Sequence, residues 1–458
     1  MLRLSCWPRR ARHSFWPITI EEALKTNSAA DLLVDCKLAP YWWDDVPRPS
    51  SAIEPLPSTV DVVVIGAGYT GLHAALQTAR GQRSTLVLDA EEAGWGCSTR
   101  NGGQVSTSVK PGFETLARRH GAPRAFEILK EGQRSLAFIG DFIRAENIDC
   151  DFAAVGRFHA AHNAARYESL AQQVSHQPKG LEVEAHMVPR AEQHSELGTD
   201  AYWGGAVYAG HCSVHPARYH QGLLERARGA GVRVAPYAAV TRIERQGERF
   251  LVRTVRGSVL ARDVVVATNG YTGAATPWLQ RRVIPIGSYI IATEELPPGL
   301  MDRLIPKNRI VSDTRMVVYY YRASPDRKRI LFGGRVSHSE TDPKVSAPLL
   351  HADMVKVFPD LTDTRISHSW SGLVAYTFDE LMHVGRHEGM HYAMGYCGAG
   401  VGTSSYFGMR VGQQVLGLAK GRTALDGLAF QTRPFYTGRP WFLAPSVRYY
   451  RWRDRQVF

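Results

Sequence analysis

TVDVVVIGAGYTGLHAALQTAR, residues 59–80, is the stretch that decides the fold. Its first seven residues form a short apolar, β-branched run of the kind that a buried parallel strand requires. Three glycines follow, and residues 72–80 have a helical pattern that ends at Gly81. A second apolar run, STLVLD at 84–89, comes directly afterwards. This order of strand, glycine loop, helix and strand predicts a βαβ unit.

The spacing of the three glycines predicts a dinucleotide site in this unit. Gly66, Gly68 and Gly71 form a G-x-G-x-x-G loop. The first glycine permits the tight turn, the second lets a diphosphate approach the backbone, and the third lets helix and strand pack closely. The N-terminus of the helix then offers free N–H donors and a positive dipole to the phosphates. Asp89, at the end of the second strand, is placed to accept from ribose hydroxyls.

A second glycine-rich loop, GWGCSTRNGGQ at 94–104, follows soon after the ribose acid. Its position fits a long cofactor whose far end runs along the protein, which favours FAD over NAD. Arg100 is a candidate for the diphosphate, and the backbone N–H groups near 101–103 are candidates for a flavin ring. The predicted cofactor contacts in this loop are Arg100, Asn101, Gly102, Gly103 and Gln104.

The composition bounds the remaining possibilities. The chain has 458 residues, of which 44% are hydrophobic and 21% charged, so it is not a collagenous, coiled-coil or wholly disordered protein. The formal net charge of +12 leaves nucleic acid, an anionic membrane or an anionic ligand open. The basic residues are dispersed except in the leader and in residues 448–455, so we expect no nucleic-acid partner.

Cysteine spacing and targeting patterns favour a cytoplasmic protein. The six cysteines are scattered without C-x-x-C pairs, which indicates reduced thiols. Residues 392–409 carry no formal charge, but their glycine and hydroxyl content makes a transmembrane helix unsuitable. We therefore expect no transmembrane segment. The sequence leaves the oligomeric state open.

Further along the chain, the predicted elements alternate. Helical patterns occupy 126–148, 166–174 and 219–228, and buried-strand signals occur at 232–234, 239–243 and 263–267. The strand MVVYYYR at 316–322 and residues 329–334 flank Ser324-Pro325-Asp326 and predict a hairpin. HEGMH at 387–391 matches the H-E-x-x-H zinc motif, but its flanking glycines favour a hairpin turn, so no metal site is predicted.

The chain resembles the D-amino-acid oxidase superfamily of FAD amine oxidases, and within it the gamma-glutamylputrescine oxidoreductase-like branch. The resemblance covers roughly residues 40–450. It is carried by the two glycine loops and by VVVATNG (264–270), ILFGG (330–334), WSGL (370–373) and the closing segment YAMGYCGAGVG (392–402).

The resemblance implies an α/β fold in which a discontinuous Rossmann-like FAD-binding domain is interleaved with an α+β substrate domain built on a mixed, largely antiparallel sheet. We expect the FAD-binding domain at 58–108, 206–275 and 378–425, and the substrate domain at 109–205 and 276–377. Residues 1–57 are expected to be a leader and linker, and residues 426–458 a C-terminal tail.

The resemblance also implies further FAD contacts and leaves the electron acceptor open. Additional cofactor residues are expected at Val240, Thr268, Gly270, Gly398, Gly400, Val401 and Gly402. The helix at 403–418 would point its N-terminus at the flavin, where its dipole stabilises the reduced, anionic ring. FAD is expected to be non-covalent, because the position that matches the flavin-linked cysteine of monomeric sarcosine oxidases offers Gly372 and Leu373. Those enzymes also carry a lysine that assists their reaction with oxygen, and the residue at the matching position here is Gly402.

The implied activity is FAD-dependent oxidation of a C–N bond in an amine or amino acid. Hydride would pass to flavin N5, and water would hydrolyse the resulting imine, with oxygen as the expected acceptor and a carrier-linked dehydrogenase as the alternative. The candidates for the substrate pocket are Tyr319, Tyr321, Trp370 and His211. Tyr319 and Tyr321 share one face of their strand, and aromatic packing in the sheet is an equally good reading of them.

Overall fold

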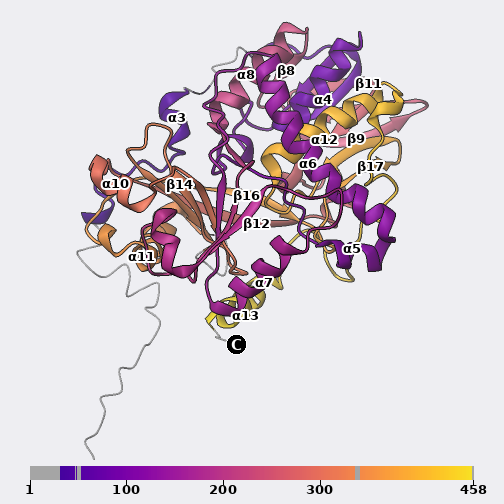
Figure 1. The fold of residues 1–458 in the computed structure, drawn as a ribbon. Coiled ribbons are helices and arrows are strands. Elements are labelled where there is room, and N and C mark those ends of the chain that lie inside the picture. The colour runs from indigo at the N-terminus through magenta and orange to yellow at the C-terminus, as the bar shows by residue number, and fades with distance from the viewer. Residues whose placement is uncertain (1–30, 47, 49–52, 336–340, 456–458) are drawn as a thin grey trace, which may run out of the picture.

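The computed structural model describes residues 31–46, 48, 53–335 and 341–455, and these residues form two domains, each built on a large sheet (Figure 1). In the view of Figure 1, the sheet that contains β12, β14 and β16 lies on the left with α10 and α11 beside it. The sheet that contains β11 and β17 lies on the right with α4, α6 and α12.

The first sheet is the nucleotide-binding one, in the order β17-β18-β11-β1-β2-β8. The pairs among β18, β11, β1, β2 and β8 are parallel. Because every residue of β2 and all residues of β1 except Thr59 and Asp61 are buried, these strands need the continuous apolar runs seen in the sequence. The bounds are β1 Thr59–Ile65, β2 Thr85–Leu88, β8 Arg233–Ala235, β11 Gly257–Val266, β17 His383–His387 and β18 Met390–Met394.

Helices cover one face of this sheet and a β meander extends from its centre. The helices α4 (Tyr69–Arg80), α6 (Ala122–Ala145), α8 (Pro216–Gly229) and α12 (Gly400–Val415) contribute to one apolar cluster with β1, β2 and β11. On the other face, β10 (Arg249–Thr254) pairs antiparallel with β11, and β9 (Val240–Gln246) pairs antiparallel with β10. The phosphate-binding end of α4 therefore lies at the carboxyl edge of a parallel sheet, where dinucleotides bind.

The second sheet is mixed, in the order β16-β12-β15-β14-β13-β4-β6-β5. Every neighbouring pair is antiparallel except β13 and β4, which run parallel. Its outer face packs against α10 (Pro298–Leu304) and α11 (Pro343–Val357) in a second apolar cluster. The strands are β4 Arg157–Ala160, β5 Ala185–Val188, β6 Gly205–Tyr208, β12 Ile284–Thr293, β13 Ile310–Asp313, β14 Tyr320–Ala323, β15 Ile330–Gly334 and β16 Ile366–Tyr376.

Two boundaries of the expected domains need correction. The helices α5 (Phe113–His120) and α6 were expected in the substrate domain, but Leu116, Ile128 and Ile139 lie in the apolar cluster of the nucleotide-binding domain. Strand β6 was expected largely in the nucleotide-binding domain, but it pairs with β4 and β5 of the substrate sheet. Amphipathic helices fit either core equally well by pattern, so the sequence cannot decide which sheet they cover.

Parts of the expected leader and tail belong to the folded body. Residues 1–30 lie outside the described residues, but Trp42, in the short helix α3 (Trp42–Asp45), is fully buried. In the tail, Phe430 stacks on His383, and the hydroxyl of Tyr436 donates to the carbonyl of Val283 at 2.6 Å. The chain then ends in helix α13 (Leu443–Arg455), whose Asp454 accepts hydrogen bonds from the backbone N–H groups of residues 316 and 317.

Two patterns noted in the sequence, HEGMH and the uncharged stretch 392–409, can be located in the structure, and the first forms the hairpin predicted for it. HEGMH lies in the antiparallel hairpin β17–β18, with the turn at Glu388 and Gly389, so its histidines do not lie one helical turn apart. No cluster of potential metal ligands occurs among the described residues. The uncharged stretch 392–409 divides into β18 and α12, and no helix in the described part of the chain is long and apolar enough to span a bilayer.

Candidate active site

The first glycine loop connects β1 to α4, and the three glycines are required by close approaches of the backbone. Gly66 has φ +105°, a conformation that favours glycine. A Cβ on Gly71 would lie 1.8 Å from the carbonyl oxygen of Gly66, which excludes any side chain there. A Cβ on Gly68 would meet only the hydroxyl of Ser98, at 2.8 Å. The glycine loop at the N-terminus of α4 therefore forms a cradle in which a bound group can contact the backbone directly.

Asp89 stands beside this cradle, at the end of β2. Its carboxylate accepts from the backbone N–H of Ala67 at 2.7 Å and from that of Glu91 at 3.0 Å. Burial raises the pKa of this carboxyl above its ordinary value, although the backbone donors act in the opposite direction. The carboxylate thus fixes the glycine loop to the second strand and lies where the ribose of a dinucleotide is held in this type of βαβ unit.

The second glycine loop is fastened from outside by tryptophan side chains. The indole Nε1 of Trp42 donates to the carbonyl of Asn101 at 2.9 Å, and that of Trp370 donates to the carbonyl of Arg100 at 2.8 Å. The indole of Trp43 donates to the hydroxyl of Thr99 at 2.9 Å. Trp42 and Trp370 come from opposite ends of the chain, so the loop is held at the junction of the two domains.

Arg100 and Asn101 use their side chains within the loop and its surroundings. The guanidinium of Arg100 lies between the rings of Trp43 and Trp95, at 4.7 and 4.5 Å, and it donates to the carbonyls of Trp95 and Ser371. The Oδ1 atom of Asn101 accepts from the N–H of Gly103 at 2.8 Å. Both side chains thus help to shape the loop, and the diphosphate contact expected for Arg100 stays a prediction.

Gly102, Gly103 and Gln104 bring the loop against the substrate sheet. Gly103 has φ +65°, and a Cβ there would lie 2.2 Å from the carbonyl oxygen of Val214. A Cβ on Gly102 would lie 3.2 Å from the ring of Tyr320. The amide of Gln104 donates to the carbonyls of residues 311 and 321. Close packing of backbone on the sheet explains the pair of glycines.

Two glycines of the closing segment differ in their surroundings: the space beside Gly398 is open, whereas Gly402 is closely packed. Gly398 has φ +93° and is exposed, and its missing Cβ would have only the hydroxyl of Tyr376 nearby, at 3.7 Å. A Cβ on Gly402 would lie 3.3 Å from the side chain of Val105, in the interior of the nucleotide-binding domain. Helix α12 begins at Gly400 and includes Val401, so the positive end of its dipole lies at this segment.

The other predicted cofactor residues lie at turns and strand starts. Thr268 follows β11, and its hydroxyl bonds that of Thr272 at 2.8 Å. A Cβ on Gly270 would lie 2.9 Å from the carbonyl oxygen of Leu373, so Gly270 is needed where β16 passes. Val240 begins β9. Whether these residues contact FAD stays a prediction.

The face of the substrate sheet that meets the glycine loops carries a polar row. Tyr320 of β14, Ser312 of β13 and His159 of β4 are direct neighbours in register, so their side chains share one face. The hydroxyl of Tyr320 bonds that of Ser288 at 2.7 Å, and Nδ1 of His159 bonds the hydroxyl of Ser312 at 3.0 Å.

Tyr319 and Tyr321 do not lie on the face that meets the loop. Tyr321 stacks on Phe332 and contacts Phe358 in the apolar cluster under α11, and Tyr319 also packs on Phe332. Their neighbour Tyr320 is the tyrosine that faces Gly102. The interpretation of these two residues as substrate walls is therefore replaced by aromatic packing, the alternative left open by the sequence. Trp370 is fully buried and supports Arg100, as described above.

The polar row continues into a cluster around Arg157, which precedes His159 by two positions on β4. The guanidinium Nη1 of Arg157 donates to the hydroxyl of Ser108 at 3.3 Å, and its Cζ lies 4.9 Å from the ring of Tyr208. That ring stacks on the imidazole of His211, whose Nε2 lies 3.2 Å from the hydroxyl of Thr107. His211 is thus close to the chain that leads away from the second glycine loop.

The imidazoles in this cluster are neutral near pH 7. Burial and the charge of Arg157 lower the pKa of His159 and of His211 to about 3. Groups with so low a pKa are weak proton acceptors at neutral pH, so neither is suited as a general base.

Lys110 and Tyr376 border the site on the side of the closing segment. The Nζ atom of Lys110 lies 5.0 Å from the centre of the Tyr376 ring. Its pKa is raised although burial acts to lower it, because Tyr376, Cys397 and Glu380 favour the charged form. Lys110 therefore adds a second positive charge at this edge of the site.

The two cysteines of the glycine loops are held as thiols. The Sγ atom of Cys97 donates to the carbonyl of Leu373 at 2.9 Å, and Cys397 donates to the carbonyl of Gly395 at 3.2 Å. Burial raises the pKa of each thiol to about 11. Because the thiolate is the reactive form, these residues are structural in character.

The sequence profile described as FAD dependent oxidoreductase matches residues 61–414, which include both glycine loops, the closing segment and the polar row. The chain belongs to the FAD dependent oxidoreductase family. It is also 32% identical, over 87% of its own length and 93% of the relative, to the gamma-glutamylputrescine oxidoreductase of Escherichia coli K12.

Solved structures of this FAD dependent oxidoreductase fold agree with the architecture. The glycine oxidase from Geobacillus kaustophilus has a TM-score of 0.68 at 19% identity and covers 82% of this chain and 99% of its own. The L-proline dehydrogenase from P. horikoshii has a TM-score of 0.65 at 16% identity and covers 85% of this chain and 99% of its own. At these identities the likeness establishes the fold, which an oxidase and a dehydrogenase share.

The cofactor of this oxidoreductase is FAD, and the glycine loops fit it. No side chain fills the space at Gly68 or at Gly398, and the half-buried carboxylate of Asp89 stands beside the first glycine loop. These are the features that a diphosphate, a ribose and a planar ring require.

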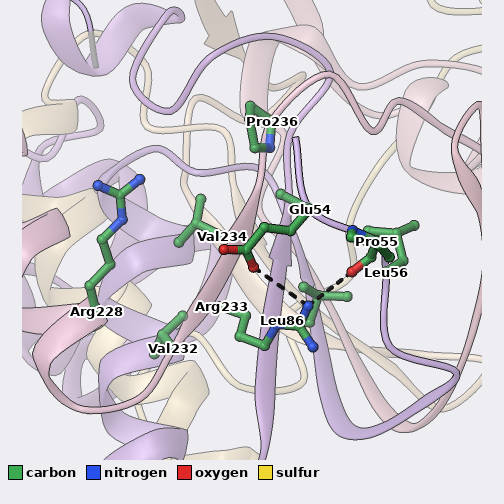
Figure 2. Close-up of a pocket in the computed structure, with 10 residues that line it drawn as sticks. Glu54, Pro55, Leu56, Leu86, Arg228, Val232, Arg233, Val234 and Pro236 are labelled. Atoms are coloured by element: carbon green, nitrogen blue, oxygen red, sulfur yellow. Dashed lines mark hydrogen bonds and ion pairs between the residues drawn. The ribbon is translucent and has the colours of Figure 1, made fainter. Parts of the chain in front are cut away.

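A separate cavity of about 380 Å³ opens at the outer edge of the nucleotide-binding sheet (Figure 2). It lies between the segment Glu54–Leu56 and strand β8. Arg233 crosses its floor, where the guanidinium donates to the carbonyl of Pro55 at 2.9 Å and pairs with Glu54 at 3.8 Å. These contacts fasten the incoming chain to the edge strand, apart from the junction of the two sheets.

Several residues of the site carried no signal in the sequence. Arg157 and His159 lie in a strand of four residues, RFHA, between loops. Tyr320 could be distinguished from its neighbours only by knowing which face of the sheet meets the loop. Lys110 follows a run of small polar residues, and Trp42 lies in a region expected to be a linker.

Proposed function

We propose that this enzyme oxidises the C–N bond of an amine held between the second glycine loop and the polar row of the substrate sheet. The observation that carries the proposal is the close approach of Gly102 to Tyr320, because it places the loop expected to carry the flavin directly on a polar, partly accessible sheet face. The name of the gamma-glutamylputrescine oxidoreductase relative supports an amine as the substrate.

The protein supplies orientation and electrostatics to this reaction. When bound, FAD provides the two-electron acceptor that the polypeptide lacks. Arg157 and Lys110 make the site positive, which disfavours an ammonium ion and favours the neutral amine that can be oxidised. The dipole of α12, which begins at Gly400, favours negative charge at the closing segment. Because His159 and His211 are weak proton acceptors, the arrangement fits hydride loss from carbon better than abstraction of a proton.

FAD is proposed to bind without a covalent link. Cys97 and Cys397 are the cysteines of the glycine loops; Cys97 is half-buried, Cys397 is buried, and each is a hydrogen-bonded thiol. The five cysteines among the described residues are all free, which supports a reducing compartment such as the cytoplasm. Oxygen is the proposed acceptor.

Anaerobic bleaching of the bound flavin tests the proposed function. Purified holoprotein is mixed without oxygen with a panel of primary amines, N-methyl amino acids and D-amino acids, and the flavin absorbance is followed. We expect at least one class to reduce the flavin, because reduction reports C–N oxidation independently of the acceptor. If no amine bleaches a flavin that dithionite reduces normally, the proposed function is wrong. Steady release of hydrogen peroxide in air distinguishes oxygen from a carrier as the acceptor.

A further inference from the structure

The C-terminal helix α13 is held to the body of the protein by one of its sides. Figure 1 shows the helix at the lower end of the molecule, beside the C-terminus. Val447 is buried, Arg451 donates to the carbonyl of Arg335 at 2.8 Å, and Asp454 accepts from the N–H groups of residues 316 and 317. The spacings of four and three residues place Val447, Arg451 and Asp454 on one side of the helix. This inner side fixes which residues point outward.

The opposite side of α13 is exposed and combines aromatic rings with arginines. Exposed residues recur there at helical spacing, and Trp441, in the turn that leads into the helix, continues the row. We call this set the outer face, and it consists of Trp441, Arg448, Tyr449, Trp452 and Arg453. The rings of Tyr449 and Trp452 contact each other with their centres 6.0 Å apart. A helix side that meets only water carries polar residues, so a row of exposed rings indicates a binding surface.

The outer face is also strongly positive. Residues 427–458 contain six arginines and no lysine, and their single acidic residue is Asp454. Asp454 lies on the inner side, where it accepts hydrogen bonds from the backbone. Arg448 and Arg453 are exposed, and neither forms an ion pair with a carboxylate in the described part of the chain. The charge of the outer face is therefore uncompensated, and the face is complementary to an anionic partner.

The segment that leads into α13 exposes a further ring at a strained position. Phe435 is 93% exposed, and its φ of +62° lies in the left-handed region that favours glycine. The ring of the buried Tyr436 lies 5.8 Å from that of Phe442, which also contacts Trp441. Phe435 and Trp441 therefore flank one inner aromatic pair. A strained backbone that presents a large apolar ring to solvent indicates a binding role for that ring.

We propose that the outer face of α13 binds the surface of an anionic phospholipid membrane. Tryptophan and tyrosine rings favour the boundary between lipid and water, and arginines beside them bind the phosphate of the headgroups. A helix of this kind lies in the plane of the interface and does not cross the bilayer. The position of α13 at the end of the molecule suits a flat, deformable surface, whereas a folded partner protein would have to supply a groove that matches the helix. The inference is independent of which amine the enzyme oxidises.

Co-sedimentation with vesicles tests the membrane site on the intact holoprotein. The protein is mixed with sucrose-loaded vesicles of phosphatidylcholine, either alone or with about 30% phosphatidylglycerol. We expect binding to the anionic vesicles in about 0.1 M salt, loss of this binding in about 0.5 M salt, and no binding to the neutral vesicles. Arg448→Gln combined with Arg453→Gln should weaken binding by about 10- to 30-fold. Trp441→Ser combined with Trp452→Ser should weaken it by about tenfold or more, because two rings no longer enter the interface.

A matched pair of substitutions controls for net charge. Arg242→Gln combined with Arg249→Gln removes two exposed arginines from β9 and β10, far from α13 in Figure 1, and should leave vesicle binding unchanged. FAD content and the unfolding midpoint show whether each protein has folded, and if the tryptophan variant fails to fold, the arginine variant decides. Equal binding to neutral and anionic vesicles, or an equal loss in the two arginine variants, overturns the assignment.

The other possible occupants of the outer face give different results with the same variants. A dimer that Trp441→Ser with Trp452→Ser dissociates, in a protein that does not bind vesicles, assigns the face to a second copy of the chain. Binding of a single-stranded oligonucleotide that requires Arg448 and Arg453, again without vesicle binding, assigns it to nucleic acid. Either result overturns the proposal. Anaerobic bleaching of the flavin by amines should be the same in all variants, so loss of vesicle binding leaves the proposed function untouched.

Discussion

Single atoms decide what the first glycine loop admits, and Gly68 is the position that separates folding from cofactor binding. A Cβ on Gly71 would clash with the carbonyl of Gly66 and disturb the βαβ unit itself. At Gly68 the nearest atom is the hydroxyl of Ser98, a side-chain atom that accepts from the N–H of Tyr69 at 3.0 Å, so its displacement costs one hydrogen bond and no backbone clash. A branched side chain at Gly68 therefore occupies the diphosphate space while leaving strand and helix in place.

Gly68→Val should yield a folded protein that has lost FAD. The methyl groups take the place of the diphosphate next to the N-terminus of α4, where backbone N–H groups hold the phosphates. The ratio of flavin absorbance to protein absorbance after purification measures the loss, and circular dichroism reports the fold. Gly229→Ala, at an open position at the exposed end of α8, is the matched control and should retain FAD. FAD at one equivalent in Gly68→Val would show that the diphosphate lies elsewhere.

Residue patterns predicted this loop well because every feature that defines it is local. The apolar run, the glycine spacing and the terminal Asp89 all lie within one βαβ unit, and the structure reproduces their order. The residues of the polar row could not be found in this way. Tyr320 and Arg157 are separated by more than a hundred residues and meet only through strand pairing, and alternation alone left both faces of MVVYYYR equivalent.

At the scale of elements, the helix α3 acts as a strap between the two domains. Lys37, which precedes α3, pairs in a β-bridge with His368 of β16, and Asp45 at the end of α3 pairs with Arg218 of α8 at 2.5 Å. Between these two anchors Trp42 is fully buried and its indole donates to the carbonyl of Asn101. The strap therefore holds the second glycine loop from outside the site.

Trp42→Phe should weaken FAD binding more than it weakens the fold. Phenylalanine keeps most of the buried apolar area but leaves the carbonyl of Asn101 without its indole donor, a loss of about 1 kcal/mol. If the loop must be ordered to hold the flavin, this loss corresponds to up to about a fivefold rise in the Kd for FAD. Quenching of FAD fluorescence on titration of the apoprotein measures it. Trp441→Phe, at a ring that is 71% exposed, is the control. A lower unfolding midpoint with unchanged Kd would show that the strap serves stability alone.

The assignment of elements to domains is where sequence patterns reached their limit. The helix patterns at 126–148 and 166–174 were confirmed as α6 and α7 (Ala164–Ser175), but α6 packs against α12 and not on the substrate sheet. An amphipathic stripe records that a helix buries one side without recording what covers it. Trp42 was missed for a related reason, because its burial depends on contacts with residues far along the chain.

Considered as a whole molecule, the protein buries many neutral histidines, and this makes its stability depend on pH. Seven of them have a pKa well below the ordinary value of 6.5 because burial disfavours the charged imidazole: His73, His159 and His211 near 3, and His162, His215, His220 and His391 near 4. Above pH 6.5 these groups are neutral in both the folded and the unfolded chain, so their contribution to stability is fully present. Below that pH the unfolded chain binds protons that the folded chain does not.

We therefore expect the free energy of unfolding to fall as the pH is lowered from 7.0 to 5.5, by about 1 kcal/mol for each such histidine. Urea unfolding of the holoprotein with excess FAD at the two pH values measures this difference in the free energy of unfolding.

His73→Leu should reduce the difference between the two pH values by about the contribution of one histidine. The partner of His73, the hydroxyl of Tyr219, keeps its bond to Ser405 at 3.0 Å, so the substitution leaves no unpaired donor. His186→Leu, at an exposed histidine of β5, should leave the pH difference as it is. An equal pH difference in wild type and His73→Leu would mean that His73 takes up a proton in the folded protein, contrary to its burial among Phe138 and Phe142.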